Sequence, residues 1–169
     1  LDNIEKGITD QPNYTPKFNR YQEGFMNRDK SIGMFIGLAI GDALGAPLEF
    51  QEAREPHKFL TKYTTGGAHN VSIGEWTDDT SMALAIGKSL IEKQTFDADD
   101  IMQKFCNWYK KGEYSTRGRC FDIGGTVSVA LRSYSETIDN SEYLQPYRGR
   151  IATDTSGNGA LMRMAPVIM

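Results

Sequence analysis

The sequence is poor in the residues that build soft metal sites and disulfide frameworks. Its 169 residues include two cysteines and two histidines. Cys106 and Cys120 do not form a Cys-x-x-Cys pair, and His57 and His69 lack the spacing of a His-Glu-x-x-His motif. We therefore expect no disulfide framework and no zinc site of the common kinds. Both thiols are predicted to be structural residues in a reducing compartment.

Long apolar runs and an excess of positive charge are also missing. The net charge is −3, so the protein has no basic field that would attract nucleic acid. The most apolar run, residues 32–40, is too short to span a bilayer and is followed by Asp42. Residues 1–30 contain no apolar segment typical of a secretory signal. These features predict a cytoplasmic protein with neither nucleic-acid nor membrane partners.

No segment shows the apolar–polar alternation of a β-strand, whereas helical periodicity followed by a polar loop recurs along the chain. This pattern predicts an all-α domain with its polar groups gathered at one end. A further short helix is expected near residues 51–54, within a loop that covers 51–75. The main predicted helices cover residues 31–46, 78–93, from the cap Asp97 to 111, from 126, and from 158.

The first 30 residues are predicted to be an extension outside the domain that covers 31–169. Prolines, glycines and side-chain amides interrupt any helical period there. Four aromatic residues are scattered through this extension, at Tyr14, Phe18, Tyr21 and Phe25. Two interpretations remain open: an arm that packs loosely on the domain, and an arm that docks onto a partner or over a site.

Four glycines lie along one stripe of the first predicted helix, at positions 33, 37, 41 and 45. Glycine costs up to about 1 kcal/mol against alanine at each helical site, so the stripe indicates close approach of another group. That group is either a neighbouring helix or a ligand. Ser31 is a candidate cap for this helix, and Asp42 and Glu49 near its end are predicted to border a cleft.

The segment Gly74–Ile91 places Thr77, Asp78 and Asp79 where a polar loop turns into an apolar helix. Two interpretations apply to these residues. Thr77 is a good N-cap, and carboxylates in a first turn interact favourably with the helix dipole. The same oxygen atoms are also the ligands preferred by a hard cation such as Mg²⁺ or Mn²⁺.

Two further glycine-rich segments precede predicted helices. One is Cys120-Phe121-Asp122-Ile123-Gly124-Gly125, and the other is Ser156-Gly157-Asn158-Gly159. Free backbone N–H groups at a helix start can bind an anion such as phosphate. The alternative is an ordinary glycine-rich N-cap.

The order of these motifs resembles the ADP-ribosylglycohydrolase family, which includes the enzyme acting on ADP-ribosylated dinitrogenase reductase. The resemblance covers about residues 30–169. It rests on Gly41-Asp42-Ala43-Leu44-Gly45-Ala46-Pro47-Leu48-Glu49-Phe50, Trp76-Thr77-Asp78-Asp79-Thr80, Cys120-Phe121-Asp122-Ile123-Gly124 and Ser156-Gly157-Asn158-Gly159-Ala160-Leu161-Met162-Arg163.

The resemblance implies a compact orthogonal helical bundle with two divalent cations, Mg²⁺ or Mn²⁺, in a cleft. It implies that Thr77, Asp78 and Asp79 are metal ligands and that Glu49 and Asp122 are catalytic. The residues that it implies for substrate binding are Gly124, Gly125, Thr126, Ser156, Gly157, Asn158 and Gly159.

The function implied by the resemblance is hydrolysis of ADP-ribose from ADP-ribosylated protein side chains, with arginine as the expected linkage. An alternative is an immunity protein whose extension at residues 1–30 binds and blocks an ADP-ribosyltransferase toxin, as some family members act against such toxins. The family's other metal ligands lie in an Asp-x-Asp-Thr/Ser motif near its C-terminus, and this chain stops before it, at Met169. We therefore expect an N-terminal portion of the domain, incomplete at its C-terminus, with a second chain as a possible source of the missing half. Alone, it could amount to a metal-binding domain without catalysis.

Overall fold

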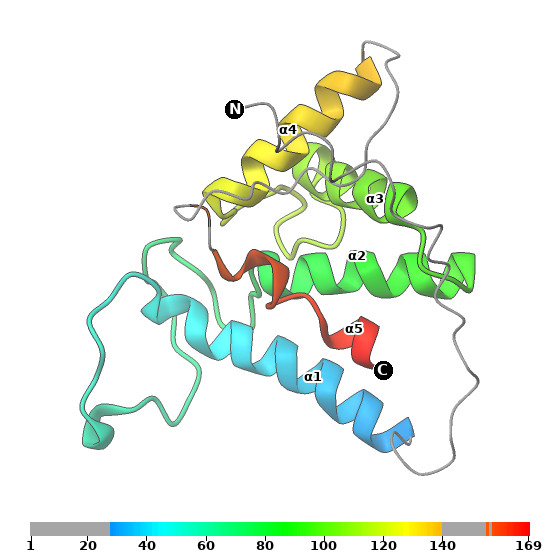
Figure 1. The fold of residues 1–169 in the computed structure, drawn as a ribbon. Coiled ribbons are helices and arrows are strands. Elements are labelled where there is room, and N and C mark those ends of the chain that lie inside the picture. The colour runs from blue at the N-terminus through cyan, green and yellow to red at the C-terminus, as the bar shows by residue number, and fades with distance from the viewer. Residues whose placement is uncertain (1–27, 140–154, 156) are drawn as a thin grey trace, which may run out of the picture.

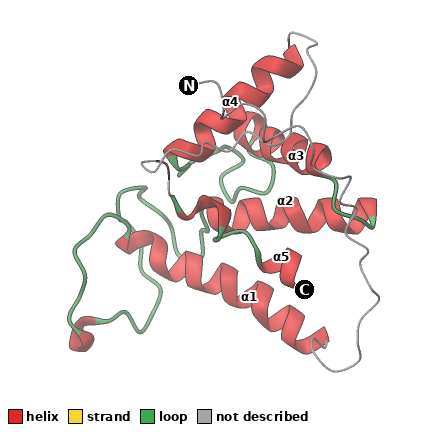
Figure 2. Cartoon of the chain, in the orientation of Figure 1, coloured by secondary structure: helices red, strands yellow, loops and turns green. Residues whose placement is uncertain are grey.

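Helices make up all the regular secondary structure of the described residues. A computed structural model describes residues 28–139, 155 and 157–169. Within these ranges no strand occurs, and the one β-type pairing is an isolated antiparallel bridge between Gly66 and Val71 (Figures 1 and 2). The prediction of an all-α fold is confirmed. The predicted extension lies almost entirely outside the described residues, and its aromatic docking role stays a prediction.

The helices follow the predicted order, with differences at several ends. The bounds are α1 Arg28–Gly45, α2 Asp78–Lys93, α3 Ala98–Lys111, α4 Gly125–Asp139 and α5 Ala165–Ile168, with short 3₁₀ helices at Ala46–Leu48, Pro56–Lys58 and Asn158–Ala160. The bounds of α2 and α3 are those predicted. In α3 the Asp97 side chain accepts a hydrogen bond from Asp100 N at 3.0 Å, as expected of a cap.

Three local predictions were wrong. Helix α1 begins at Arg28, so Ser31 lies inside it rather than capping it; Asp29 in the first turn favours the helix dipole and helps to extend it. The short helix of the 51–75 loop lies at Pro56–Lys58, because proline is well suited to a first helical position. The segment from residue 158 is a 3₁₀ turn, and regular helix resumes only in α5, which has Pro166 in its first turn.

Helix α2 is the centre of the packing. It contacts α1, α3 and α5, and α4 packs on the far side of α3 (Figure 1). The buried cluster consists of Met82, Ala85, Ile86, Ile101, Phe105, Cys106, Trp108, Leu131 and Tyr134. The α3 members of this cluster recur at helical spacing, as the predicted helical periodicity requires. Both cysteines are free thiols, with Cys106 in this core.

The glycine stripe of α1 has a different explanation from close helix packing. A side chain added at Gly33, Gly37, Gly41 or Gly45 would meet nothing within 4 Å in the described part of the chain. Three of these glycines, at positions 37, 41 and 45, instead line a cavity. The close-packing interpretation is therefore wrong for the described residues, and the stripe leaves open space along the cavity wall.

Helix α1 also carries exposed apolar side chains. Ile32, Ile36 and Ile40 are 43%, 52% and 49% exposed. With its 3₁₀ continuation, Arg28–Leu48 is long and apolar enough to cross a membrane by length and composition alone. The predicted absence of a membrane partner is not tested by this finding. In the described fold, Asp42 of this helix accepts hydrogen bonds from the start of α2.

Candidate functional site

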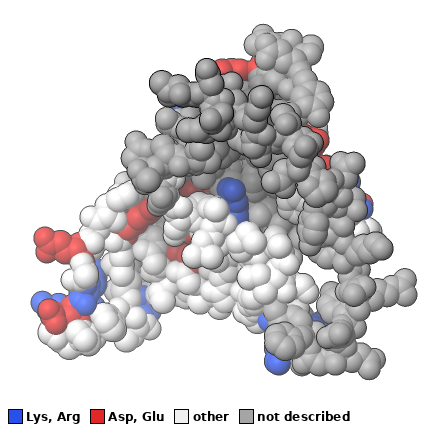
Figure 3. Space-filling model, viewed as in Figure 1, with Lys and Arg blue, Asp and Glu red and all other residues white. Residues whose placement is uncertain are grey.

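A cavity of about 1290 Å³ lies between the end of α1, the start of α2, the start of α4 and the segment 157–163. The described part of the face in Figure 3 is largely uncharged, with acidic atoms and a patch of basic atoms near its middle. The structure brings eleven of the twelve predicted site residues to this cavity, and Ser156 lies outside the described residues. Those lining it are Glu49, Thr77, Asp78, Asp79, Asp122, Gly124, Gly125, Thr126, Gly157, Asn158 and Gly159.

The start of α2 is capped from another helix. Thr77 occupies the N-cap position, but its side chain makes no capping hydrogen bond. Instead the Thr77 hydroxyl donates to Asp42 Oδ1 at 2.8 Å, and the Thr80 hydroxyl donates to Asp42 Oδ2 at 2.6 Å. The backbone N–H groups of Thr77 and Thr80 also donate to Asp42, at 3.0 Å and 3.1 Å. The predicted N-cap position of Thr77 is confirmed, but the acceptor for the N–H groups at this helix start is the Asp42 carboxylate of α1 and not the Thr77 side chain.

Asp78 and Asp79 are adjacent carboxylates in the first turn of α2. Asp78 is 7% exposed and Asp79 is half-buried. Burial first, and then the neighbouring Asp122 and Asp79 carboxylates, raise the pKa of Asp78 to about 7. Burial, Asp42 and Asp122 raise the pKa of Asp79 to about 6. Among the described residues, no Lys, Arg or His forms an ion pair with either carboxylate.

This donor set fits a hard divalent cation. Two carboxylates and a hydroxyl lie together on the cavity wall, and burying like charges without a counter-charge is unfavourable. A divalent ion supplies that counter-charge and prefers oxygen ligands. The residues Thr77, Asp78 and Asp79 are thus suited to the predicted metal role by their chemistry and their burial.

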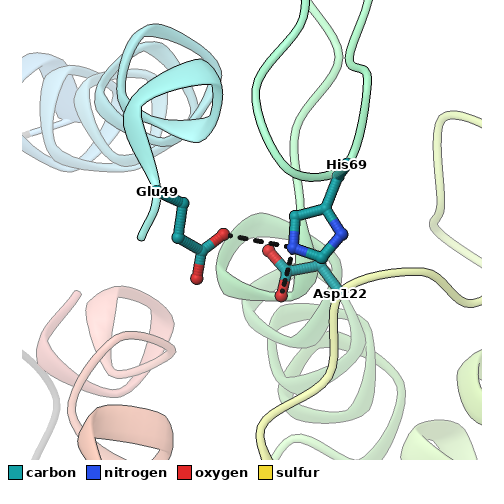
Figure 4. Close-up of side chains that lie close together, drawn as sticks. All are labelled: Glu49, His69 and Asp122. Carbon is teal, nitrogen blue, oxygen red and sulfur yellow. Dashed lines mark ion pairs between the residues drawn. The ribbon is translucent and has the colours of Figure 1, made fainter. Parts of the chain in front are cut away.

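Glu49 and Asp122 meet at a histidine that we had not predicted as a site residue. His69 Nε2 lies 3.2 Å from Asp122 Oδ1 and 3.5 Å from Glu49 Oε2 (Figure 4). One ligand atom from each of the three side chains lies within 4.8 Å of the other two, so the three could also hold a metal ion. Burial and the adjacent Asp122 carboxyl raise the pKa of Glu49 to about 8. No local spacing in the sequence could have identified His69, because its partners lie far away along the chain.

The loop that carries Asp122 is attached to the start of α2. The Trp76 indole Nε1 donates to the carbonyl oxygen of Tyr114 at 3.0 Å. The Ser81 hydroxyl donates to the carbonyl oxygen of Thr77 at 2.7 Å and lies 3.3 Å from that of Tyr114. These contacts keep the 112–124 loop beside Thr77 and the carboxylates of Asp78 and Asp79.

The two glycine-rich segments lie against each other at the other end of the cavity. The Thr126 hydroxyl donates to the carbonyl oxygen of Thr155 at 3.4 Å. A side chain at Gly159 would come within 2.7 Å of Val127 Cγ2, so a glycine is needed for this approach. Four glycines line this end of the cavity, at positions 124, 125, 157 and 159, and glycines let a ligand approach backbone N–H groups closely.

A basic side chain, Arg163, also lines the cavity and was missed as a site residue. Its guanidinium carbon lies 4.9 Å from the centre of the Phe105 ring, and Nη1 lies 3.7 Å from Met82 Sδ. It forms no ion pair with a carboxylate in the described part of the chain. Burial lowers its pKa. The only sequence signal for Arg163 is its place at the end of the motif that runs from Ser156 to Arg163.

Comparison with known proteins gives a consistent result. The model of the family described as ADP-ribosylglycohydrolase matches residues 26–169. The chain is 41% identical over 138 residues to ADP-ribosylarginine hydrolase Tri1 of Serratia proteamaculans, covering 82% of this chain and 36% of that protein. It is 38% identical over 139 residues to the protein of the same name from Pseudomonas putida, covering 82% and 35%.

A third relative comes from Rhodospirillum rubrum and is named ADP-ribosyl-dinitrogen reductase glycohydrolase. The chain is 37% identical to it over 144 residues, which cover 83% of this chain and 44% of that protein. The chain therefore spans less than half of the length of each of these relatives.

Proposed function

Because the chain belongs to the ADP-ribosylglycohydrolase family, we propose that it is part of a hydrolase that removes ADP-ribose from modified protein side chains. The linkage that we propose is to arginine, since two relatives at 41% and 38% identity are named ADP-ribosylarginine hydrolases. We further propose a cytoplasmic location.

The observation that carries this proposal is the gathering of carboxylates in one cavity beside backbone-lined turns. Asp78, Asp79, Asp122 and Glu49 all lie on its wall, and Gly124 and Gly157 lie along the same cavity. Cleavage at the ribosyl C1 atom passes through a state with oxocarbenium character, which carboxylates can stabilise. A diphosphate needs hydrogen-bond donors, which the glycine-rich turns offer.

Thr77, Asp78 and Asp79 would hold a divalent cation, Mg²⁺ or Mn²⁺. When bound, such a cation supplies charge stabilisation and a lowered pKa for a bound water molecule. The chain's own contribution is to place the hydroxyl and the two carboxylates side by side at the start of α2, where Asp42 fixes the backbone. Arg163, on the same wall, adds a positive charge that would attract the diphosphate.

Glu49 and Asp122 would divide the proton chemistry. With a pKa of about 8, Glu49 holds a proton at neutral pH, so its carboxyl group can donate to the departing nitrogen. Asp122 lies beside it with a side chain that is 10% exposed and can stabilise positive charge at the ribose. A partly buried acid next to a second carboxylate is a familiar arrangement for cleaving glycosidic bonds.

Replacing Asp78 and Asp79 together by alanine tests the proposal. We expect release of ADP-ribose from an ADP-ribosylated arginine substrate to fall at least ~100-fold, because the cation would lose two of its ligands. The measurement is ADP-ribose release by the full protein in the presence of Mn²⁺ or Mg²⁺. The matched control is E52A/E55A, which removes two exposed carboxylates outside the cavity and should leave release unchanged. Unchanged release by D78A/D79A would rule the proposal out.

A further inference from the structure

His69 stands behind the cavity wall rather than on it. Glu49 and Asp122 line the cavity, whereas His69 does not. Its Nε2 atom is shielded from solvent and makes no well-directed hydrogen bond in the described part of the chain, and its closest polar neighbours are the two carboxyl groups. In Figure 4 the contacts from the Glu49 and Asp122 carboxyl groups both end on the same ring nitrogen of His69. We propose that His69 is a positioning residue whose Nε2–H holds the Glu49 and Asp122 carboxyl groups at their working separation; the inference rests on the proposed hydrolase function.

The loop that carries His69 rests on the segment that carries Glu49. Gly66 and Val71 exchange two backbone hydrogen bonds of 2.8 Å, which close a tight turn around His69. A side chain at Gly67 would lie 2.5 Å from the carbonyl oxygen of Pro47. The turn therefore sits directly on the backbone two residues before Glu49, and the distance from the imidazole to that side chain is set by backbone contact.

Arg117 joins the same turn to the segment that carries Asp122. Its Nη1 donates to the carbonyl oxygen of His69 and its Nη2 to that of Asn70, each at 3.0 Å. Its Nη2 also lies 2.6 Å from Glu75 Oε2. The guanidinium carbon lies 4.0 Å from the centre of the Phe121 ring, and Phe121 directly precedes Asp122. The planar guanidinium thus fixes His69 and Asp122 relative to each other, which a lysine could not do.

Backbone strain is concentrated around this cluster. Phe50, Asn70 and Asp122 have φ angles of +61°, +47° and +52°. One is a member of the cluster and the other two directly follow Glu49 and His69. Non-glycine residues in this region cost about 1 kcal/mol or more and persist where the surroundings hold them in place. Phe50 is 80% exposed, and the centre of its ring lies 6.0 Å from that of the His69 imidazole.

A pair of amide substitutions separates positioning by Nε2 from a general need for the imidazole. In H69Q the side-chain amide nitrogen reaches the place of Nε2, whereas in H69N it reaches only the place of Nδ1. We expect H69Q to keep kcat within about threefold of the wild type and H69N to lower kcat at least ~30-fold with KM little changed. Equal kcat values for H69Q and H69N, whether both high or both low, would overturn the proposal.

The second variant is R117K, which keeps the charge but loses the fork that holds the turn. We expect it to lower kcat at least ~10-fold with KM little changed, as H69N does, because the imidazole would lose its fixed place. A wild-type kcat in R117K would contradict the role of Arg117 in positioning His69.

A structural readout keeps the inference separate from the proposed function. Crystal structures of the H69Q and H69N proteins give the separation of the Glu49 and Asp122 carboxyl groups directly. We expect the wild-type separation in H69Q and a larger one in H69N. An unchanged separation in H69N would refute positioning by His69. A wild-type protein that releases no ADP-ribose would refute the proposed function, and the two structures would still test the positioning.

Discussion

At the scale of single residues, Gly67 holds the turn that carries His69 in place. It has a φ of +71°, and an added Cβ would lie 2.5 Å, 2.7 Å and 2.8 Å from three backbone atoms of Pro47. Backbone cannot move aside as the end of a flexible side chain can. Gly74 provides a comparison, because its φ is +83° and an added Cβ there would meet nothing within 4 Å.

We expect G67A to lower the free energy of unfolding by about 2–3 kcal/mol and G74A by about 1 kcal/mol, since both pay for a left-handed φ and only G67A also clashes. Urea unfolding measures both values. The kcat of G67A should fall further than that of G74A, because His69 moves with the turn. If the two variants lose the same stability, the contact with Pro47 does not matter.

The sequence predicts which residues share the site only where those residues lie close together along the chain. Thr77, Asp78 and Asp79 are consecutive, so their shared cavity wall followed from the start of one helix. His69 lies 20 residues from Glu49 and 53 from Asp122, and only tertiary folding brings these three together. Motif spacing does not indicate His69 as a site residue, because such spacing detects only ligands that lie close together along the chain.

At the scale of elements, the start of α2 depends on α1. Asp42 accepts hydrogen bonds from the backbone N–H and the hydroxyl of both Thr77 and Thr80. The α3 start depends on one such bond, from Asp100 N to the Asp97 side chain. The start of α2 is therefore capped by a residue of another helix, whereas the start of α3 is capped by the residue directly before it.

We expect D42A to lower the free energy of unfolding by about 2–4 kcal/mol, because it leaves several buried donors without an acceptor. The control D97A should cost about 1 kcal/mol, the usual loss for a local cap. Urea unfolding followed by circular dichroism gives both values. A D42A protein as stable as D97A would show that water replaces the lost acceptor.

Element bounds were predictable where caps and periodicity agree. Helices α2 and α3 begin after Thr77 and Asp97 and follow clear apolar stripes. The glycines and apolar residues after residue 157 predict a helix, but the structure has a 3₁₀ turn there before the four-residue α5. The glycine stripe of α1 predicts a group packed close to the helix, whereas in the described structure three of its four glycines border an open cavity.

At the scale of the whole molecule, the buried carboxylates make stability depend on pH. The folded pKa values of Asp78, Asp79 and Glu49 are about 7, 6 and 8, well above their ordinary values of 3.8, 3.8 and 4.5. Between these values the folded state binds more protons than the unfolded state. The free energy of unfolding therefore falls as the pH rises from about 4 to about 8.

A divalent cation should counteract this loss of stability near pH 8. With a chelator present, we expect the urea midpoint to decrease steadily from pH 5 to pH 8. Added Mn²⁺ should raise the midpoint at pH 8 more than at pH 5, because protons no longer compete for the carboxylates. The D78N/D79N protein should lose the Mn²⁺ effect and keep only the part of the pH trend that Glu49 causes. An equal Mn²⁺ effect at both pH values would contradict cation binding by these carboxylates.

The family and the all-α class followed from ordered motifs and helical periodicity, and both are confirmed. The packing that defines the site did not follow, because it depends on contacts such as Arg117 with the turn at His69 and Asp42 with the start of α2. Each joins residues more than 30 positions apart, and no local pattern in the sequence pairs them.

The placement of the two tryptophans gives the protein an optical consequence. Trp76 is half-buried, directly precedes Thr77 and donates to the carbonyl oxygen of Tyr114, whereas Trp108 is fully buried in the core. No other tryptophan occurs in the sequence. Fluorescence from the indole at position 76 therefore reports on events at the cavity, while that from position 108 reports on global unfolding. The emission spectrum of the protein is thus the sum of one signal from the site and one from the core.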